Sequence, residues 1–198
     1  ERSHEFMNKL HVILGLLHLK SYKQLENYIL KTANNYQEEI GSLLGKIKSP
    51  VIAGFLLSKI NRTSDLGHSL VISNESQLPE NNNEDQVAVL ITVLGNLIEN
   101  ALEALGQEPG GEISVSLHYR HGWLHCEVND DGPGIAPEHI EHIFEKGVSS
   151  KGTERGVGLA LVKQQVENVG GNISVESEPG IFTQFFVQLP WNGERASR

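Results

Sequence analysis

Two glycine-rich segments constrain what this chain can fold into more than any other feature. The first is 129–135, Asn-Asp-Asp-Gly-Pro-Gly-Ile, and the second is 156–161, Gly-Val-Gly-Leu-Ala-Leu. Asp130 closes an apolar, strand-like run, where a carboxylate can accept a hydrogen bond from the exocyclic amine of adenine. Gly156 and Gly158 open a predicted helix, whose free amides and dipole favour phosphate. Together the segments predict a nucleotide pocket.

Neither segment is diagnostic by itself. The run Asp-Asp-Gly-Pro-Gly is also an ordinary turn signal, although Gly132 and Gly134 would let the backbone pass close to a base. A lone Gly-x-Gly is weak evidence. The sequence has neither Walker A spacing nor a Gly-x-Gly-x-x-Gly that follows a strand, so P-loop and dinucleotide-binding folds lack their signatures.

The composition of the chain limits which kinds of partner it can have. The 198 residues leave room for one ordinary domain and a helical appendage. A formal net charge of −9, with no long basic block, gives a nucleic-acid partner little electrostatic support. Cys126 is the only cysteine, which excludes a disulfide framework and a cysteine-based metal site. No uninterrupted apolar run has the length of a membrane helix, so we expect a soluble chain without direct membrane contact.

The chain changes character near residue 65. Before it, apolar residues recur at helical spacing and predict two helices that meet near 20–22 as an antiparallel hairpin. Two helices cannot enclose a core, so a second copy is the simplest cover, giving a four-helix bundle. A third helix is predicted from Ser49-Pro50 to Asn61. The two apolar stripes are Phe6, Leu10, Ile13, Leu14 and Leu17, then Leu25, Tyr28, Ile29, Thr32, Tyr36, Ile40, Leu43, Leu44 and Ile47.

Beyond residue 65, predicted strands and helices alternate, which indicates an α+β domain. We expect the hairpin over 1–48, a connecting helix over 49–65, the α+β domain over 66–192 and a frayed tail over 193–198. The elements expected inside the α+β domain are a strand over 66–73, a helix over 84–105, a hairpin around 120–122, a short helix over 138–144, a lid over 146–155, a helix over 156–169 and a hairpin around 178–180.

Asn96 and Asn100 stand four residues apart and therefore share one face of the predicted helix 84–105. Their amide oxygens can complete the shell of a magnesium ion that phosphates and waters mostly hold. Alone, the pair would be two solvated surface asparagines. Combined with the glycine segments, it favours the magnesium interpretation.

At this point the sequence resembles the transmitter region of sensor histidine kinases. Along the chain, the stretch 96–101, the stretch 130–134, Phe144 and the stretch 156–159 look like that family's N, G1, F and G2 boxes, and their order and spacing also match. The resemblance implies a Bergerat-type α/β sandwich that uses ATP and Mg²⁺. By that resemblance the ATP-binding residues are Asn96, Asn100, Asp130, Gly132, Gly134, Ile135, Phe144, Lys146, Lys151, Arg155, Gly156, Val157, Gly158 and Leu159, with Asn100 as the Mg²⁺ ligand.

The phosphate acceptor is then expected in the helical hairpin, where 3–8 resembles the family's H box. His4 is the expected nucleophile, Glu5 can orient its ring and accept its proton, and Asn8 lies one helical turn further on. The Glu-x-x-Asn pattern resembles the one that orients water for dephosphorylation of a response regulator. His11 and His18 are alternative acceptors on the same helix, but neither has an adjacent acid.

Asn96 also bears on the reaction. Related hydrolases, the gyrase and mismatch-repair ATPases, carry a water-activating glutamate at the corresponding position, and its absence here favours transfer over hydrolysis. The chain departs from the commoner kinase pattern in three ways: no Arg-Thr-Pro follows His4, Glu103 stands where many relatives have a phosphate-contacting lysine, and Ala160 replaces a glycine. We therefore expect Lys146, Lys151 or Arg155 to supply positive charge.

The start of the chain is similar to citrate and C4-dicarboxylate (fumarate) sensor kinases of two-component systems. The resemblance implies a homodimeric protein-histidine kinase that phosphorylates His4, transfers the phosphoryl group to a response regulator receiver domain and has regulator phosphatase activity. It also implies upstream membrane-anchored sensor domains, with this part on the cytoplasmic side of a bacterial inner membrane. The alternatives are a phosphorelay phosphotransferase, a pseudokinase scaffold that binds no ATP, and a gyrase-like ATPase.

Overall fold

The computed structural model describes residues 2–32, 37–145 and 158–192. Contacts divide the chain into two compact units, Glu1–Ser42 and Leu43–Arg198. The division falls inside helix α3 (Gln37–Lys46), whereas the sequence predicted a hairpin that continues to residue 48. Leu43 and Ile47 belong to the hydrophobic core of the second unit. Apolar periodicity therefore identified these positions as buried, but it did not identify which unit buries them.

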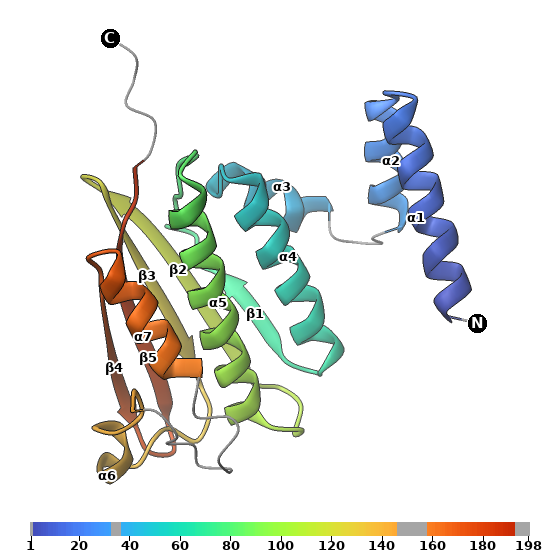
Figure 1. Cartoon of the computed structure of the whole chain (residues 1–198). Helices are drawn as coiled ribbons and strands as arrows, with labels where there is room; N and C mark the ends of the chain where they lie inside the picture. Colours follow the sequence, from blue (N-terminus) through green and yellow to red (C-terminus); the bar gives the residue numbers. More distant parts are fainter. Residues whose placement is uncertain (1, 33–36, 146–157, 193–198) are drawn as a thin grey trace. The chain divides into compact units, whose positions relative to one another are not determined.

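The first unit contains the predicted hairpin of α1 (Arg2–His18) and α2 (Tyr22–Thr32). The two helices run side by side in opposite directions (Figure 1). Lys20 adopts a φ of 53°, and Ser21 N donates to Leu16 O, which closes the turn. Large apolar side chains remain exposed on this pair: Met7, Val12, Leu14, Leu17, Leu19, Tyr22 and Ile29.

The second predicted hairpin helix corresponds to α2 and α3, with residues 33–36 outside the described part of the chain. The end of α3 is hydrogen-bonded within the second unit. Leu78 N donates to Lys46 O, and Lys48 N donates to Leu78 O, at 2.9 and 2.8 Å. Because Leu78 is itself buried, these bonds fix residues 46–48 to the core.

A five-stranded mixed sheet forms the centre of the second unit. Its order is β1-β2-β3-β5-β4, with β1 parallel to β2 and the other pairs antiparallel. The predicted strand 66–73 is shorter than expected, because α4 continues to Asp65 and Gly67 turns the chain with a φ of 83°. The strands are β1 (Ser69–Ile72), β2 (Glu112–Arg120), β3 (Trp123–Asp130), β4 (Asn172–Glu178) and β5 (Phe182–Pro190).

The two predicted hairpins are present. His121 and Gly122 join β2 to β3 and both have positive φ, 50° and 85°, as a two-residue hairpin turn requires. Gly180, with a φ of 79°, lies in the β4–β5 turn. Side chains alternate between the two faces of each strand, and along β3 every second residue from Leu124 to Asp130 is buried. This alternation directs the Asp130 carboxyl inward.

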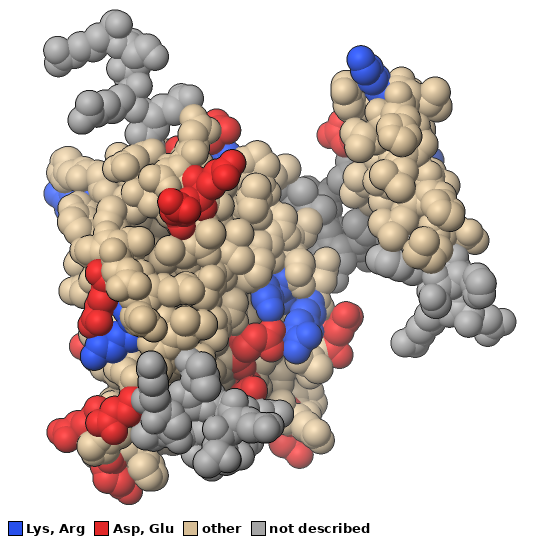
Figure 2. All heavy atoms as spheres, in the orientation of Figure 1, with Lys and Arg blue, Asp and Glu red and all other residues tan. Residues whose placement is uncertain are grey.

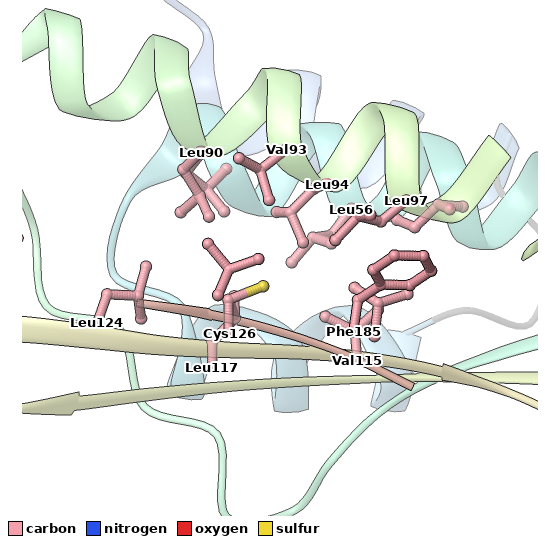
Figure 3. Packing of buried hydrophobic residues seen from close by; sticks show 14 of the residues in the cluster. Leu56, Leu90, Val93, Leu94, Leu97, Val115, Leu117, Leu124, Cys126 and Phe185 are labelled. Carbon is pink, nitrogen blue, oxygen red and sulfur yellow. The ribbon is translucent and has the colours of Figure 1, made fainter. Parts of the chain in front are cut away.

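Helices α4 (Pro50–Asp65), α5 (Glu84–Leu105) and α7 (Gly158–Asn168) cover one face of the sheet (Figure 1). Figure 3 shows side chains of α5, such as Leu94, pointing at strand residues such as Cys126 and Phe185. α5 has the predicted bounds, and Asn83 caps it by accepting from Gln86 N at 3.1 Å. Helix α6 (Pro137–Ile140) is shorter than the predicted 138–144.

Among the described helices, α5 alone is long and apolar enough to cross a membrane. Its apolar side chains form a stripe on one face, and that stripe is buried against the sheet. Packing in the core of the second unit accounts for this composition. The buried residues of α5 are Leu90, Val93, Leu94, Leu97, Ile98, Ala101 and Leu102.

Candidate nucleotide-binding site

Asn96 of α5 and Gly158 of α7 come together at one end of the site. The Asn96 Nδ2 donates to Thr92 O at 2.8 Å, which orients the side-chain amide. A Cβ added to Gly158 would lie 2.8 Å from Asn96 Oδ1, closer than real Cβ atoms approach such an atom. An alanine at position 158 would therefore require either the Asn96 amide or the first turn of α7 to shift. The helix-opening glycine and the asparagine motif form one structural unit.

Asn100 lies one turn further along α5. Its Nδ2 is buried, and within the described residues it has no hydrogen-bond partner. A buried amide with no partner costs free energy, so the fold alone does not account for it. The Asn100 Nδ2 thus has a donor capacity that the described residues do not use. The amide oxygen of the same side chain is a hard donor of the kind that Mg²⁺ prefers. These residues fit a magnesium-bound triphosphate.

Asp130 ends β3 with only 4% of its surface exposed. Its Oδ1 accepts from Gly132 N at 3.0 Å. The pKa of Asp130 is raised to about 6: burial raises it most, the hydrogen bond from Gly132 offsets part of that rise, and the nearby Asp131 adds a smaller upward contribution. A carboxylate held in this way is a hydrogen-bond acceptor whose charge the protein only partly compensates. It fits a ligand that donates, such as the amine of adenine.

Gly132 and Gly134 both lie close to neighbouring atoms, and at Gly134 those atoms belong to the backbone. A Cβ on Gly132 would lie 2.7 Å from Asp130 Oδ1. Gly134 has a φ of 69°, and a Cβ there would overlap the backbone carbonyl of Glu178. Gly180 N also donates to Pro133 O at 2.7 Å. The loop 131–135 is therefore held in place by the β4–β5 hairpin.

Two site residues were missed at the sequence level, Ser177 and Thr183. Thr183 of β5 pairs directly with Asp130 of β3, and Ser177 of β4 pairs with Thr183. Ile135 N donates to Ser177 Oγ at 2.7 Å. Sequence alternation could have placed both side chains on the inner face, but the pairing of β3 with β5 is non-local and no short motif signals it.

Phe144 is half-buried and packs edge-on against Phe185 of β5, with ring centroids 6.3 Å apart. Lys163 of α7 places its Nζ 5.6 Å from the centroid of the Phe144 ring, within cation–π distance. Leu159, the next residue of α7 after Gly158, packs against the hydrophobic core. Phe144 thus anchors the segment that follows α6 to both the sheet and α7.

Positive charge close to the asparagines comes from α4. Lys59 Nζ lies 2.6 Å from one carboxylate oxygen of Glu99, and Arg62 Nη2 lies 3.1 Å from the other. Figure 2 shows such neighbouring positive and negative side chains on the face of the second unit that α4 and α5 cover. Glu99 lies between Asn96 and Asn100 in sequence, so this ion pair ties the asparagine segment to α4.

The predicted site residues of the lid and of the acceptor helix differ in how far the structure describes them. Lys146, Lys151, Arg155, Gly156 and Val157 lie outside the described residues. For His4 and Glu5 the structure gives the helix, α1, and not the side chains, whereas Asn8 is exposed on the same helix. Because the two units are separate bodies, the acceptor and the nucleotide site are described individually.

Comparison with known proteins assigns both parts of the chain. The family described as histidine kinase-, DNA gyrase B-, and HSP90-like ATPase matches residues 85–193, and the SpoOB-type sensor kinase α-helical domain matches residues 1–44. The chain belongs to the histidine kinase-, DNA gyrase B- and HSP90-like ATPase family, in its sensor histidine kinase branch. The resemblance stated from the sequence, and the predicted combination of a helical domain with an ATPase domain, are confirmed.

Named relatives place the chain more closely. It is 85% identical to the sensor histidine kinase DcuS of Escherichia coli K12 over the whole chain, and 37% identical over 196 residues to the sensor protein CitS of Bacillus subtilis. A probable C4-dicarboxylate sensor kinase of Halalkalibacterium halodurans is 36% identical over 192 residues. The chain spans 36% of the length of each of these relatives.

Solved structures agree with the fold. The catalytic domain of histidine kinase ThkA superposes with a TM-score of 0.56 at 25% identity, over 71% of this chain and 91% of that one. The mycobacterial sensor histidine kinase MprB gives 0.55 at 25% identity, over 73% and 95%. Full-length ShkA, solved with AMPPNP, gives 0.53 at 26% identity, over 72% and 30%.

Proposed function

We propose that this chain is the ATP-dependent core of a protein-histidine kinase, which phosphorylates His4 and passes the phosphoryl group to an aspartate of a response regulator. The observation that carries the proposal is the Asn96 amide. It occupies the position of a hydrolytic base, its nitrogen is already bonded to Thr92 O, and Gly158 lies against its oxygen. An amide held in this way cannot remove a proton from water. The site therefore favours a donor of phosphoryl groups over an ATPase.

The remaining residues supply binding and orientation. Asp130 accepts from the adenine amine, and the α7 N-terminus at Gly158 faces the phosphates. Asn100 holds Mg²⁺, which when bound neutralises charge on the phosphates. A ring nitrogen of neutral His4 attacks the γ-phosphorus of ATP, the bond to the β-phosphate oxygen breaks, ADP leaves, and Glu5 accepts the ring proton. Lys146, Lys151 or Arg155 supplies further positive charge to the phosphates.

The partners follow from the first unit. Its exposed apolar side chains, including Leu14 and Leu17, need a cover, and a second copy of the hairpin supplies it by forming a four-helix bundle. The receiver domain of a response regulator is the expected phosphoryl acceptor. Sensor domains anchored in the bacterial inner membrane precede this part in the whole protein, and their stimulus is a C4-dicarboxylate. The names of two relatives, a sensor histidine kinase and a probable C4-dicarboxylate sensor kinase, support a sensory role and this class of stimulus.

Other functions predict different chemistry. A gyrase-like ATPase needs a base at position 96, and a phosphorelay phosphotransferase or a pseudokinase scaffold would not require the glycines that bring Gly158 to Asn96 and Gly134 to the Glu178 carbonyl. The buried Asp130 carboxyl, and the Asn100 Nδ2 that has no hydrogen-bond partner among the described residues, are also accounted for by a bound nucleotide. These features favour a kinase over a scaffold.

The test is incubation of the chain with γ-labelled ATP and Mg²⁺. The label should appear in the protein, be lost in acid and persist in base, as expected for phosphohistidine. His4→Gln should abolish labelling while ATP binding is kept, and His11→Gln, on the same helix, should label normally. Label that persists in His4→Gln would overturn the assignment of the acceptor.

A further inference from the structure

One row of residues crosses the sheet at the nucleotide site. Asp130 of β3 pairs with Thr183 of β5, and Thr183 pairs with Ser177 of β4. Asp130 and Thr183 are buried and Ser177 is half-buried, so the strand alternation turns all three toward the helices. Of these three residues, only Asp130 contacts the nucleotide in the proposed function. The other two are hydroxyls, whose hydrogens can rotate and whose polarity depends on their neighbours.

Ser177 has a fixed set of partners. Its Oγ accepts from Ile135 N at 2.7 Å and donates to Phe182 O at 2.8 Å. A backbone N–H can only donate and a carbonyl oxygen can only accept, so these two bonds fix the direction of each. The single hydroxyl proton of Ser177 has two acceptors within reach, Phe182 O at 2.8 Å and Thr183 Oγ1 at 3.1 Å, and only donation to the nearer Phe182 O lets Ser177 bond to all three neighbours. One lone pair of Ser177 Oγ remains.

That lone pair determines the direction of the hydrogen bond between Ser177 and Thr183. The two hydroxyl oxygens are 3.1 Å apart, and Ser177 has no proton left to give. Thr183 must then be the donor to Ser177. With its proton directed at Ser177, the Thr183 hydroxyl presents only lone pairs to the rest of the site. It becomes a hydrogen-bond acceptor that lies beside another acceptor, the Asp130 carboxylate.

We propose that Ser177 is a specificity-determining positioning residue, which locks Thr183 as an acceptor so that the pocket selects a purine with a donor at position 6. Adenine carries an amine there and satisfies an acceptor. Inosine and guanine carry a carbonyl oxygen, whose lone pairs would face two acceptors. A pocket with a free threonine hydroxyl could rotate its proton toward that carbonyl, whereas this pocket cannot. The proposal rests on the nucleotide site of the proposed function, but not on phosphoryl transfer.

Ser177 also supports the loop that carries the site, through Ile135 N, and this purely structural role makes a different prediction. A loosened loop would weaken ATP and inosine triphosphate (ITP) alike, because both carry the same triphosphate. A change in hydroxyl polarity would alter the ratio of the two affinities. The ratio of the ITP and ATP dissociation constants therefore separates the two roles.

The experiment is calorimetric titration of the 198-residue chain with Mg²⁺-ATP and with Mg²⁺-ITP. Ser177→Ala should lower the ITP to ATP ratio of dissociation constants by about tenfold, equivalent to one hydrogen bond of about 1.4 kcal/mol. Ser177→Thr keeps the hydroxyl and should retain the ratio. Ser174→Ala, at an exposed position of the same strand, is the matched control and should change neither affinity.

Thr183→Val provides a second arm if Ser177→Ala does not fold. It removes the acceptor while keeping the shape of the side chain, and should lower the same ratio. In the double variant the second substitution should add almost nothing, because both act through one hydroxyl. An unchanged ratio in Ser177→Ala, or in Thr183→Val, would overturn the proposal. Failure of the parent chain to bind ATP would instead contradict the proposed function.

Discussion

Gly158, the first residue of α7, lies so close to Asn96 of α5 that a Cβ at position 158 would be 2.8 Å from Asn96 Oδ1. This contact connects the asparagine motif to the second glycine motif. It also fixes the Asn96 amide from both sides, since its nitrogen donates to Thr92 O. The geometry of the phosphate end of the site thus depends on the lack of a side chain at Gly158.

Gly158→Ala should lower the affinity for ATP by about tenfold or more, because either Asn96 or the first turn of α7 must move. Calorimetric titration with Mg²⁺-ATP measures the effect. Gly54→Ala is the matched control: Gly54 is exposed inside α4 and a Cβ there meets no atom within 4 Å. It should leave affinity unchanged and stabilise the helix by about 0.5–1 kcal/mol. Normal ATP affinity in Gly158→Ala would contradict the role assigned to this contact.

Asp130→Asn should lose ATP binding and yet gain stability relative to the parent chain as pH rises. Burial raises the pKa of Asp130 from 3.8 to about 6, so the folded chain holds this proton more tightly than the unfolded chain does. The resulting stabilisation is complete below pH 3.8 and is lost as pH rises through about 6. Asparagine cannot ionise and avoids that loss.

Urea unfolding at pH 4 and pH 8 tests this sign. The difference in free energy of unfolding, variant minus parent, should be larger at pH 8. If the difference in free energy of unfolding became smaller as pH rises, the fold would be stabilising the ionised Asp130 carboxylate, which is the opposite of the prediction.

Thr63→Val should stabilise the second unit by about 1 kcal/mol. Thr63 is fully buried in α4, and its Oγ1 has no hydrogen-bond partner within the described residues. Valine has the same shape and removes the unsatisfied hydroxyl. Thr92→Val is the comparison, because the Thr92 hydroxyl donates to Ala88 O at 3.1 Å and its loss offers no such gain. Urea denaturation of both variants gives the change in free energy of unfolding for each. Equal changes in Thr63→Val and Thr92→Val would count against a stabilising effect of removing the unsatisfied hydroxyl.

Asn8→Ala should slow dephosphorylation of the response regulator more than it slows phosphorylation of His4. Asn8 is exposed on α1, one helical turn from His4, and its amide can orient a water without taking part in the attack on ATP. The two rates are measured separately, with labelled ATP and with phosphorylated regulator. Asn8→Gln is the companion variant, which keeps the amide but displaces it. Equal losses in both reactions would remove Asn8 from a water-orienting role.

The sequence predicted local structure well. The bounds of α5 agree with the structure because they depend on neighbours: Asn83 caps the helix and acidic residues occupy the first turn. The β2–β3 hairpin was equally predictable, since His121 and Gly122 form its turn. The sensor kinase resemblance rested on ordered motifs of this kind, and comparison confirmed it.

Non-local relationships were harder to predict. Ser177 and Thr183 join the site through the pairing of β5 with both β3 and β4, and no residue spacing encodes that pairing. Leu43 and Ile47 have the same periodicity whether they face a second copy or the core of the second unit, and the structure places them in the core. The contact of Gly158 with Asn96 likewise depends on where α7 packs.

The most direct test of the account follows the fate of the phosphoryl group. The chain is mixed with Mg²⁺ and γ-labelled ATP, without a regulator, and ADP, free phosphate and protein-bound label are counted through the first turnover. Because Asn96 cannot activate water, each ADP formed should be matched by one acid-labile label on His4, and little free phosphate should appear. Free phosphate that accumulates as fast as ADP, and equally in His4→Gln, would show that the site hydrolyses ATP and would contradict the account.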